Sequence, residues 1–206
     1  MFDPCIAHQI KALSAHRLSA FFMAARPLPD GRTARRKKYP MQVIHCDEAQ
    51  LDILAALFNE YRIFYEQETD LAASRAFIQQ NLAQARSRIF LLLDEEGTAV
   101  GFSQLYPAIC SLAMRPYYYL SDLYVSQSAR KNGYARYLMN YITDHFSREG
   151  AQRLTLDTAT TNRVAQSLYE SLGYEREEVY ITYHQMLAAP EPLSVPQRTD
   201  QPIPIS

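Results

Sequence analysis

Apolar and polar positions recur with short, regular periods between Met41 and about residue 187. Alternation with a period of two, or a run of β-branched and aromatic residues, is typical of β-strands. Strands are predicted at residues 42–46, 88–93, 99–106, 119–125, 153–157 and 178–186. The turn at 94–97 makes the second and third of these a hairpin. Pro107 is expected to end the third strand, and an irregular loop through Ser111 and Pro116 then leads into the fourth.

Between these strands the apolar residues recur every three to four positions, which is typical of amphipathic helices. Helices are predicted after Asp47, Asp70, Gly133 and near Asn162, with these apolar faces: Leu51, Leu54, Phe58 and Tyr61; Ala73, Phe77, Ile78 and Leu82; Ala135, Leu138, Met139, Ile142 and Phe146; Val164, Ala165, Leu168 and Leu172. Asp47 and Asp70 can cap the helices that follow them, because their carboxylates accept hydrogen bonds from free backbone N–H groups. The order of elements predicts an α/β sandwich with a mixed sheet, in one domain of residues 41–187.

The two ends of the chain have a different composition. Residues 1–40 combine a short apolar stretch with Pro, Gly and a basic run, and residues 188–206 are rich in proline. Such segments cannot bury enough apolar surface to offset the entropy lost on ordering. We therefore expect a disordered N-terminal extension, residues 1–40, and a disordered tail, residues 188–206.

Charge and cysteine content narrow the classes of function. The formal net charge of −1 divides into +6 over residues 1–40 and −7 over the rest. An acidic folded part argues against a nucleic-acid-binding surface, although the basic run leaves contact with RNA or anionic lipid open. Cys5, Cys46 and Cys110 are scattered without metal-ligand spacing, so we predict no disulfide framework, no metal and a cytoplasmic location. No apolar run approaches the roughly 20 residues that span a membrane.

The stretch from the strand at 119–125 into the following helix has the features of a phosphate-binding loop. Residues 126–132 form a short polar loop that carries Arg130 and Lys131. The first backbone N–H groups of a helix lack internal partners, and the helix dipole adds partial positive charge there. Gly133 allows the backbone to approach a bulky ligand closely. A solvated turn could have the same residues, so the assignment needs support from elsewhere.

That support comes from a resemblance to a known family. The spacing Arg130-x-x-Gly133-x-Ala135 resembles the acyl-CoA signature of the GCN5-related N-acetyltransferases, Arg/Gln-x-x-Gly-x-Gly/Ala. Residues 162–174, Asn-Arg-Val-Ala-Gln-Ser-Leu-Tyr-Glu-Ser-Leu-Gly-Tyr, are similar to the same family's Asn-x-x-Ala-x-x-Leu-Tyr-x-x-x-Gly-Phe/Tyr element. The resemblance covers residues 41–187. It implies that acetyl-CoA donates an acetyl group to a primary amine by direct attack in a ternary complex, without a metal.

The resemblance also implies roles for single residues. The backbone near Leu123 would polarise the thioester carbonyl, and the pantetheine arm would pair beside Val125. The residues that would hold the pyrophosphate are Arg130, Lys131, Asn132, Gly133 and Ala135. Asn162 would contact a pantetheine amide, with a helix N-cap as the competing interpretation. Tyr169 would protonate the departing CoA thiolate, with a core tyrosine as the alternative.

The general base is less well specified. Many family members place a glutamate on the central strand, and Asp122 is the one carboxylate on that strand here. Strict alternation puts Asp122 on the face of Leu120 and Tyr124, away from Ser121. Asp122 would then act through water, or across a bulge that re-aims it, or be structural.

On the acceptor side, Tyr61, Tyr65 and Tyr119 are the candidate substrate-binding residues, and several carboxylates follow Tyr65. Aromatic rings beside carboxylates suit a small cation, so a polyamine-like or amino-acid-like amine is the favoured acceptor. Tyr61 could instead belong to the core. Two other functions stay open: a protein lysine or N-terminal acetyltransferase, and a non-catalytic acyl-CoA-binding sensor module. A homodimer is also left open.

Overall fold

The computed structural model describes residues 40–187. The two expected extensions, residues 1–40 and 188–206, therefore lie outside the described residues except for Pro40. The elements in chain order are β1 (Gln42–His45), the 3-10 turn η1 (Glu48–Gln50), α2 (Leu51–Phe64), α3 (Leu71–Ala83), β2 (Arg88–Leu93), β3 (Ala99–Cys110), β4 (Arg115–Val125), the 3-10 turn η2 (Gln127–Ala129), α4 (Tyr134–Arg148), β5 (Leu154–Leu156) and α5 (Arg163–Ser171).

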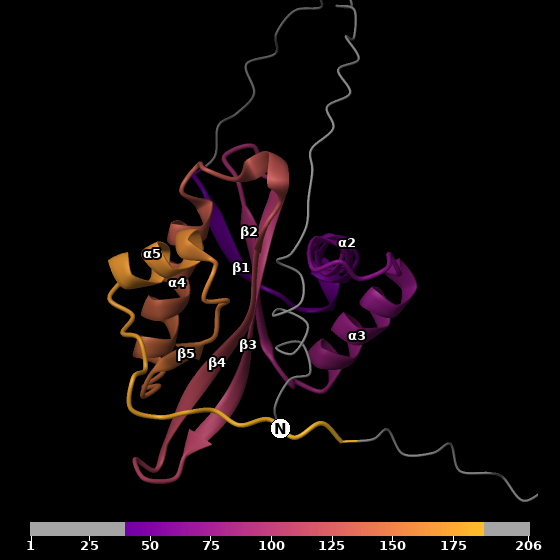
Figure 1. The fold of residues 1–206 in the computed structure, drawn as a ribbon. Coiled ribbons are helices and arrows are strands. Elements are labelled where there is room, and N and C mark those ends of the chain that lie inside the picture. The colour runs from indigo at the N-terminus through magenta and orange to yellow at the C-terminus, as the bar shows by residue number, and fades with distance from the viewer. Residues whose placement is uncertain (1–39, 188–206) are drawn as a thin grey trace, which may run out of the picture.

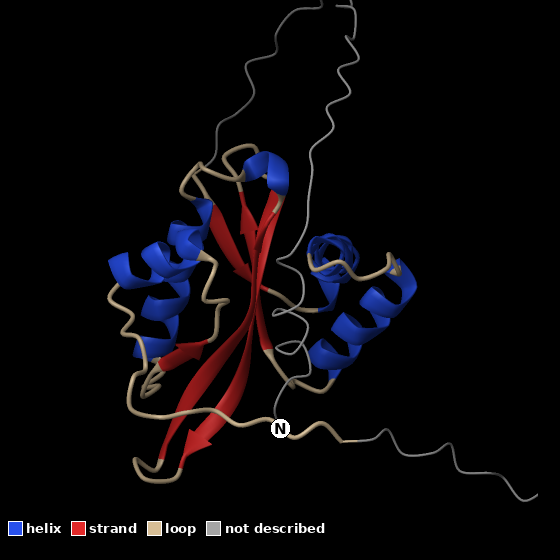
Figure 2. Ribbon diagram, viewed as in Figure 1, coloured by secondary structure: helices blue, strands red, loops and turns tan. Residues whose placement is uncertain are grey.

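The strands form one mixed sheet in the order β1-β2-β3-β4-β5. All neighbours are antiparallel except β4 and β5, which run parallel. Helices α2 and α3 cover one face of the sheet, and α4 and α5 cover the other (Figures 1 and 2). The predicted α/β sandwich in a single domain is confirmed.

Each face of the sheet has its own core. Under α2 and α3 the buried residues include Leu54, Ile78 and Phe102. Under α4 they include Leu120 and Leu138. β2 contributes to both cores because its successive side chains point to opposite faces, so it is an almost continuous apolar run rather than an alternating one. Burial of one such side chain contributes about 1.5–3 kcal/mol to folding.

The start of each helix on the first face is set by an aspartate. Asp47 caps η1, accepting the Ala49 N–H at 2.7 Å, and the chain continues directly from η1 into α2. Asp70 caps α3, accepting the Ala73 N–H at 2.8 Å. Both caps confirm the prediction.

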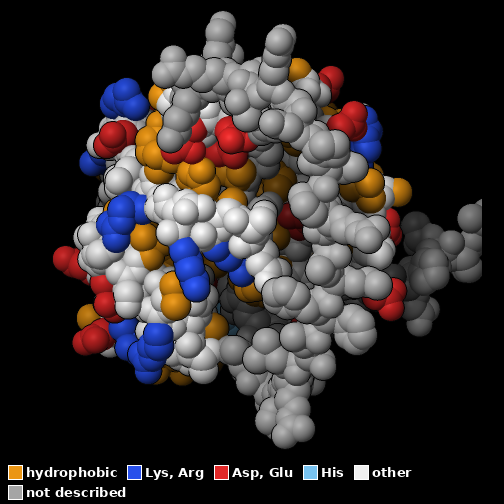
Figure 3. Space-filling view, turned by 90° about the horizontal axis from the view of Figure 1, so that it is seen from above, with side chains coloured by type: hydrophobic (Ala, Val, Ile, Leu, Met, Phe, Trp, Pro, Cys, Tyr) orange, Lys and Arg blue, Asp and Glu red, His pale blue; other side chains and the backbone are white. Residues whose placement is uncertain are grey.

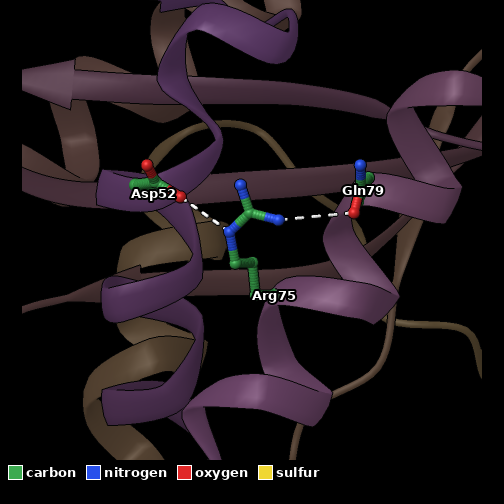
Figure 4. A network of polar contacts seen from close by, with 3 residues as sticks. All are labelled: Asp52, Arg75 and Gln79. Carbon is green, nitrogen blue, oxygen red and sulfur yellow. Dashed lines mark hydrogen bonds and ion pairs between the residues drawn. The ribbon is translucent and has the colours of Figure 1, made fainter.

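The two helices are also joined at their surface (Figure 4). The Arg75 side chain of α3 pairs with Asp52 of α2 at 2.7 Å and contacts Gln79 at 3.4 Å. Such an exposed pair adds at most about 1 kcal/mol, so apolar packing must hold α2 and α3 together.

β4 contains a β-bulge at Ser121. On β3, the adjacent residues Gln104 and Leu105 are opposite Asp122 and Leu120, so Ser121 is the extra residue. An extra residue breaks the alternation of faces. Leu120 packs under α4, and beyond the bulge Tyr124 packs under α2 and α3. The expectation that these two residues share a face is therefore wrong.

The hairpin of β3 and β4 is longer than predicted. Pro107 does not end β3: the strand continues to Cys110 opposite the first residues of β4, and Pro116 lies inside β4. The irregular loop expected through Ser111 is the turn of this hairpin, which extends beyond the helices (Figure 1). β2 begins at Arg88, opposite Leu105, so the outer part of β3 has no strand on that side, and a proline is tolerated there.

Two predicted helix faces are partly wrong. α3 buries Ser74, Ile78 and Asn81, whereas Ala73 and Phe77 are exposed. The α3 face is shifted because polar side chains take part in buried contacts with α2 and β3. On α5, Val164 is 85% exposed, because α5 packs on the sheet through half-buried residues further along the helix.

The predicted strand at 178–186 is not formed. Residues 175–187 run as a loop, and the apolar side chains between Val179 and Leu187 are largely exposed, Tyr183 by 84%. Alternation indicates that a segment can form a strand, but the segment must also pair with the edge of a sheet. Residues 178–186 do not pair with β5: within residues 40–187, β5 is paired with β4 alone.

Candidate active site

The candidate site lies at the point where β5 ends beside β4. The two strands are paired only from Tyr118 opposite Leu154 to Leu120 opposite Leu156. The bulge at Ser121 follows immediately, and from there to Val125 β4 is paired with β3 alone. The β5 side of this stretch, which includes Leu123, therefore has no strand partner among residues 40–187, because β5 ends at Leu156. Backbone groups along such an edge can pair with a ligand that carries amides.

The loop after β4 has a backbone suited to an anion. Lys131 and Gly133 both have positive φ, at 68° and 80°. Left-handed residues in such a loop turn successive N–H groups toward a common point. The first backbone hydrogen bond within α4 runs from the Tyr137 N–H to the Gly133 carbonyl at 3.0 Å. The N–H groups before Tyr137, including that of Ala135, are thus available at the positive end of the helix dipole.

Gly133 is required by its conformation rather than by crowding. A Cβ atom at this position would meet no heavy atom within 4 Å. A left-handed conformation costs an L-residue about 1–2 kcal/mol, so glycine is the favoured residue there. Lys and Arg side chains lie beside apolar ones on this end of the molecule (Figure 3).

The Arg130 side chain does not extend over the start of α4. Its Nε donates to the Val125 carbonyl at 3.0 Å, and its guanidinium lies 4.7 Å from the centre of the Phe64 ring. It thus joins the end of β4 to the end of α2. Next to it, Glu60 accepts hydrogen bonds from Tyr124 at 3.3 Å and Ser126 at 3.0 Å. Sequence reasoning missed Glu60, because neither motif includes it.

Tyr169 is half-buried on α5, with its ring 5.9 Å from that of Tyr174. Burial, with smaller effects of Tyr65 and Tyr174, raises the pKa of Tyr169 to about 12. The phenol is therefore protonated at neutral pH and can only donate a proton.

Asn162 caps α5. Its Oδ1 accepts the Ala165 N–H at 3.2 Å, as the N-cap interpretation predicts. The cap uses only the side-chain oxygen, so the Nδ2 group keeps its donors for a ligand.

Asp122 lies on the α2–α3 face, 5% exposed. Its Oδ2 accepts a hydrogen bond from Gln104 Nε2 at 3.0 Å, and the same nitrogen is 2.7 Å from the Tyr106 hydroxyl. Asn81 of α3 donates to this hydroxyl at 3.2 Å. The bulge has therefore re-aimed Asp122, one of the options that the sequence left open. Gln104 was missed, although a glutamine inside an apolar strand is a signal that could have identified it.

The three candidate acceptor tyrosines lie in different environments. Tyr61 is 6% exposed and packs against Phe102, as expected of a core residue. Tyr65 is half-buried at the end of α2. The Tyr119 hydroxyl donates to Asp157 at 2.7 Å, which ties β4 to the residue after β5. The structure thus leaves Tyr61 in the core and Tyr65 and Tyr119 partly exposed.

No cluster of potential metal ligands occurs among residues 40–187. In the same range, no helix has the length and apolar content needed to cross a membrane. Cys46 is buried, which raises the pKa of its thiol to about 12 and leaves it unreactive at neutral pH.

The mixed sheet and its flanking helices match those of known acetyltransferases. A solved structure of a probable acetyltransferase has a TM-score of 0.68 and 33% sequence identity, covering 72% of this chain and 99% of that chain. The model of the acetyltransferase (GNAT) family matches residues 52–174. The chain therefore belongs to the GCN5-related N-acetyltransferase family, as the two sequence motifs indicated.

Two curated relatives bear on function. The uncharacterized N-acetyltransferase YhfO of Bacillus subtilis is 41% identical over 130 residues, 63% of this chain and 87% of the relative. An aminoglycoside N(6')-acetyltransferase type 1 of Serratia marcescens is 24% identical over 148 residues, 70% of this chain and 99% of the relative. The protein is thus a GNAT acetyltransferase with aminoglycoside acetyltransferases among its relatives.

Proposed function

We propose that the protein transfers the acetyl group of acetyl-CoA to a primary amine of a small molecule, by direct attack in a ternary complex. The observation that carries the proposal is the edge of β4 beyond the end of β5, which has no strand partner on that side among residues 40–187 and leads into the left-handed loop at the start of α4. A ligand with amides at one end and a pyrophosphate at the other fits the two features together. Acetyl-CoA has both, and it is the acetyl donor of the family.

The donor side would be held mainly by backbone groups. The pantetheine arm would pair along Val125, and Asn162 Nδ2 would donate to one of its amides. The backbone N–H near Leu123 would stabilise the developing oxyanion, an interaction typically worth about 3–4 kcal/mol. The pyrophosphate would lie on the N–H groups of the loop and first helical turn, with the charge of Lys131. The full proposed set is Leu123, Val125, Arg130, Lys131, Asn132, Gly133, Ala135 and Asn162.

The chemical step needs one base and one acid. The amine nitrogen forms a bond to the thioester carbonyl carbon, and the bond between that carbon and sulfur then breaks. Asp122 would accept the proton that the amine loses, directly or through a water molecule. Tyr169 would give its proton to the departing thiolate and regain one from solvent. The pKa of about 12 keeps the phenol protonated at neutral pH, which is the form that a general acid needs.

The acceptor would enter on the α2–α3 face. Tyr65 and Tyr119 would offer aromatic surface there, and Glu60 and the largely buried Asp122 would offer carboxylates. This combination suits an amine with more than one positive charge. The relation to aminoglycoside acetyltransferases supports a polyamine-like or aminosugar acceptor. Tyr61 does not belong to this surface, because it is buried in the core. The cytoplasmic location and the homodimer stay predictions.

The test is acetyl-CoA-dependent release of free thiol with a panel of polyamines, amino acids, aminoglycosides and short peptides. Release that depends on a small amine is expected. Release only with peptides would favour a protein acetyltransferase instead. Tight acetyl-CoA binding without release from any amine would favour the sensor module and overturn the proposal.

Charge reversal at Arg130 tests the phosphate end of the donor site. Arg130→Glu is expected to raise the Kd for acetyl-CoA by roughly tenfold or more, because a positive charge beside the pyrophosphate loop is replaced by a negative one. Isothermal titration measures the Kd. Arg148→Glu makes the same charge change at the other end of α4 and should leave affinity within about twofold. Equal effects of the two variants, or an unchanged Kd in Arg130→Glu, would remove Arg130 from the site.

A further inference from the structure

A network of hydrogen-bonded polar side chains lies between α3 and β4. Asn81 Nδ2 donates to the Tyr106 hydroxyl at 3.2 Å, and Gln104 Nε2 lies 2.7 Å from that hydroxyl and 3.0 Å from Asp122 Oδ2. Asn81 is 2% exposed, Gln104 is fully buried, and Asp122 is 5% exposed. These side chains come from α3, β3 and β4, so their hydrogen bonds connect three elements in one network.

The hydrogen-bonding capacity of the carboxylate fixes the direction of this network. An ionised carboxylate can only accept hydrogen bonds, so the nitrogen end of the Gln104 amide must face Asp122. The other N–H of the same amide is directed to Tyr106. Gln104 Oε1 is then left without a hydrogen-bond partner among residues 40–187. A buried acceptor without a partner costs about 1–3 kcal/mol.

That cost is not explained by packing. Gln104 lies in β3 between Ser103 and Leu105, and its same-face neighbour Phe102 is a fully buried apolar residue. An apolar side chain at position 104 would remove the orphan oxygen. Retention of the amide is understandable if its nitrogen has a task, and its two contacts are the Asp122 carboxylate and the group that holds the amide in place.

The bulge at Ser121 places Asp122 within reach of Gln104. The two residues are opposite each other in the ladder because the extra residue shifts the register. If Ser121 were instead a regular residue of the ladder, Asp122 would point to the α4 core, on the other face of the sheet from α3 and Asn81. The bulge and the polar network therefore act on the same carboxylate, one by aiming it and the other by holding it.

We propose that Gln104 is a positioning residue for the acetyl transfer: it holds the Asp122 carboxylate in the orientation that receives the amine proton, while Tyr106 and Asn81 hold the Gln104 amide. This inference rests on the proposed role of Asp122 as general base. Gln104 itself does not contact the acceptor. Its removal should therefore lower turnover through Asp122 and leave donor binding unchanged.

The competing explanation is structural, since the network also ties α3 to the sheet. Loss of a structural tie lowers the thermal unfolding midpoint and acts on kcat and KM without regard to Asp122. Loss of a positioning contact acts on kcat alone and only while the carboxylate is present. A double-mutant cycle separates the two explanations.

The test uses Gln104→Met, Asp122→Asn and the double variant, assayed with the best amine of the panel. We expect Gln104→Met to lower kcat by roughly 10–100-fold, because a small misplacement of a reacting group can cost that much. The KM for acetyl-CoA should stay within about twofold. In the Asp122→Asn background, Gln104→Met should cause no further fall in the residual kcat. Tyr106→Phe, which keeps the ring, should follow the same pattern with a smaller effect.

The matched control is Ser87→Ala, which removes another buried hydroxyl, outside the network, and should leave kcat unchanged. The inference is overturned if Gln104→Met has wild-type kcat, or if the two effects multiply in the double variant. Wild-type kcat in Asp122→Asn would instead remove the general base, and this inference with it. Should Gln104→Met fail to fold, Tyr106→Phe alone decides between the two explanations.

Discussion

Deletion of Ser121 is expected to abolish acetyl-CoA binding while the domain stays folded. Ser121 is the extra residue of the β4 bulge. Without it, Leu120 would be followed directly by Asp122, and ordinary alternation would keep Leu120 under α4 and Asp122 and Tyr124 under α2 and α3. The cores on both faces would therefore keep their side chains, and stability should change little.

The ligand-binding edge, in contrast, depends on the bulge. A bulge bends its strand and increases the local twist, and β4 separates from β5 at this point. Without the bulge this bend would be lost, and the backbone at Leu123 would change its direction relative to the loop at the start of α4. We expect at least a 100-fold loss of kcat/KM, about 2.7 kcal/mol, since misplacement of about 1 Å can have that effect.

Circular dichroism measures the folded structure, thermal unfolding measures the stability, and titration with acetyl-CoA measures the Kd, all on one preparation. Release of free thiol with the best amine of the panel measures kcat/KM. Ser121→Ala is the matched control, because it changes the side chain but retains the extra residue, and it should bind acetyl-CoA with nearly wild-type affinity. Retained binding in the deletion variant would mean that acetyl-CoA binding does not depend on the bulge. Equal losses in both variants would assign the effect to the serine side chain.

Tyr169→Phe should lower kcat by roughly 100-fold, the lower end of the range for a general acid, with the Kd for acetyl-CoA changed less than about threefold. The variant keeps the ring that packs between α5 and Tyr174 and removes only the proton donor. Tyr174→Phe is the control, since it removes a neighbouring buried hydroxyl at a position where the family accepts Phe or Tyr. Wild-type turnover in Tyr169→Phe would leave Tyr169 as a core residue.

The pH dependence of kcat follows from the direction of the shift. Burial raises the pKa of Tyr169 from 10 to about 12, so the folded protein holds this proton more tightly than the unfolded chain does. The acid is therefore fully protonated below pH 10, and it is lost only as the pH approaches 12. We expect kcat to rise with pH as the amine is deprotonated and then to stay level up to pH 10. The stability due to the neutral phenol disappears over the same high range, between pH 10 and 12. A fall in kcat between pH 8 and 9 that is absent in Tyr169→Phe would contradict the buried-acid interpretation.

Strong local patterns were sufficient to predict most of the fold. The 3.6-residue period after Gly133 gave α4 its buried face, and the capping chemistry of Asp70 gave the start of α3. Interactions between distant segments could not be read in the same way. The bulge at Ser121 leaves the apparent alternation of the sequence intact, because it is defined by the register against β3. Pro107 looks like a strand end unless it is known that β2 stops before reaching it.

The candidate site divides along the same line. The loop around Gly133 and the α5 motif around Tyr169 are local, so their spacing carries the information. The contacts of Asp122 with Gln104, and of Glu60 with Ser126, join residues that are 18 and 66 positions apart. No spacing rule covers such pairs, since tertiary packing alone brings them together.

The short pairing of β4 with β5 has a consequence for the amount of protein that survives in a cell. The ladder between β4 and β5 ends after three residue pairs, so a donor bound along β4 beyond it would complete the sheet in place of a strand. Folding and donor binding then share one equilibrium, and a ligand present at 100 times its Kd adds about 2.7 kcal/mol to the free energy of unfolding. Proteases act on the unfolded fraction, which falls about 100-fold for that gain. The steady-state level of the enzyme would therefore rise and fall with the supply of acetyl-CoA, without any dedicated regulator.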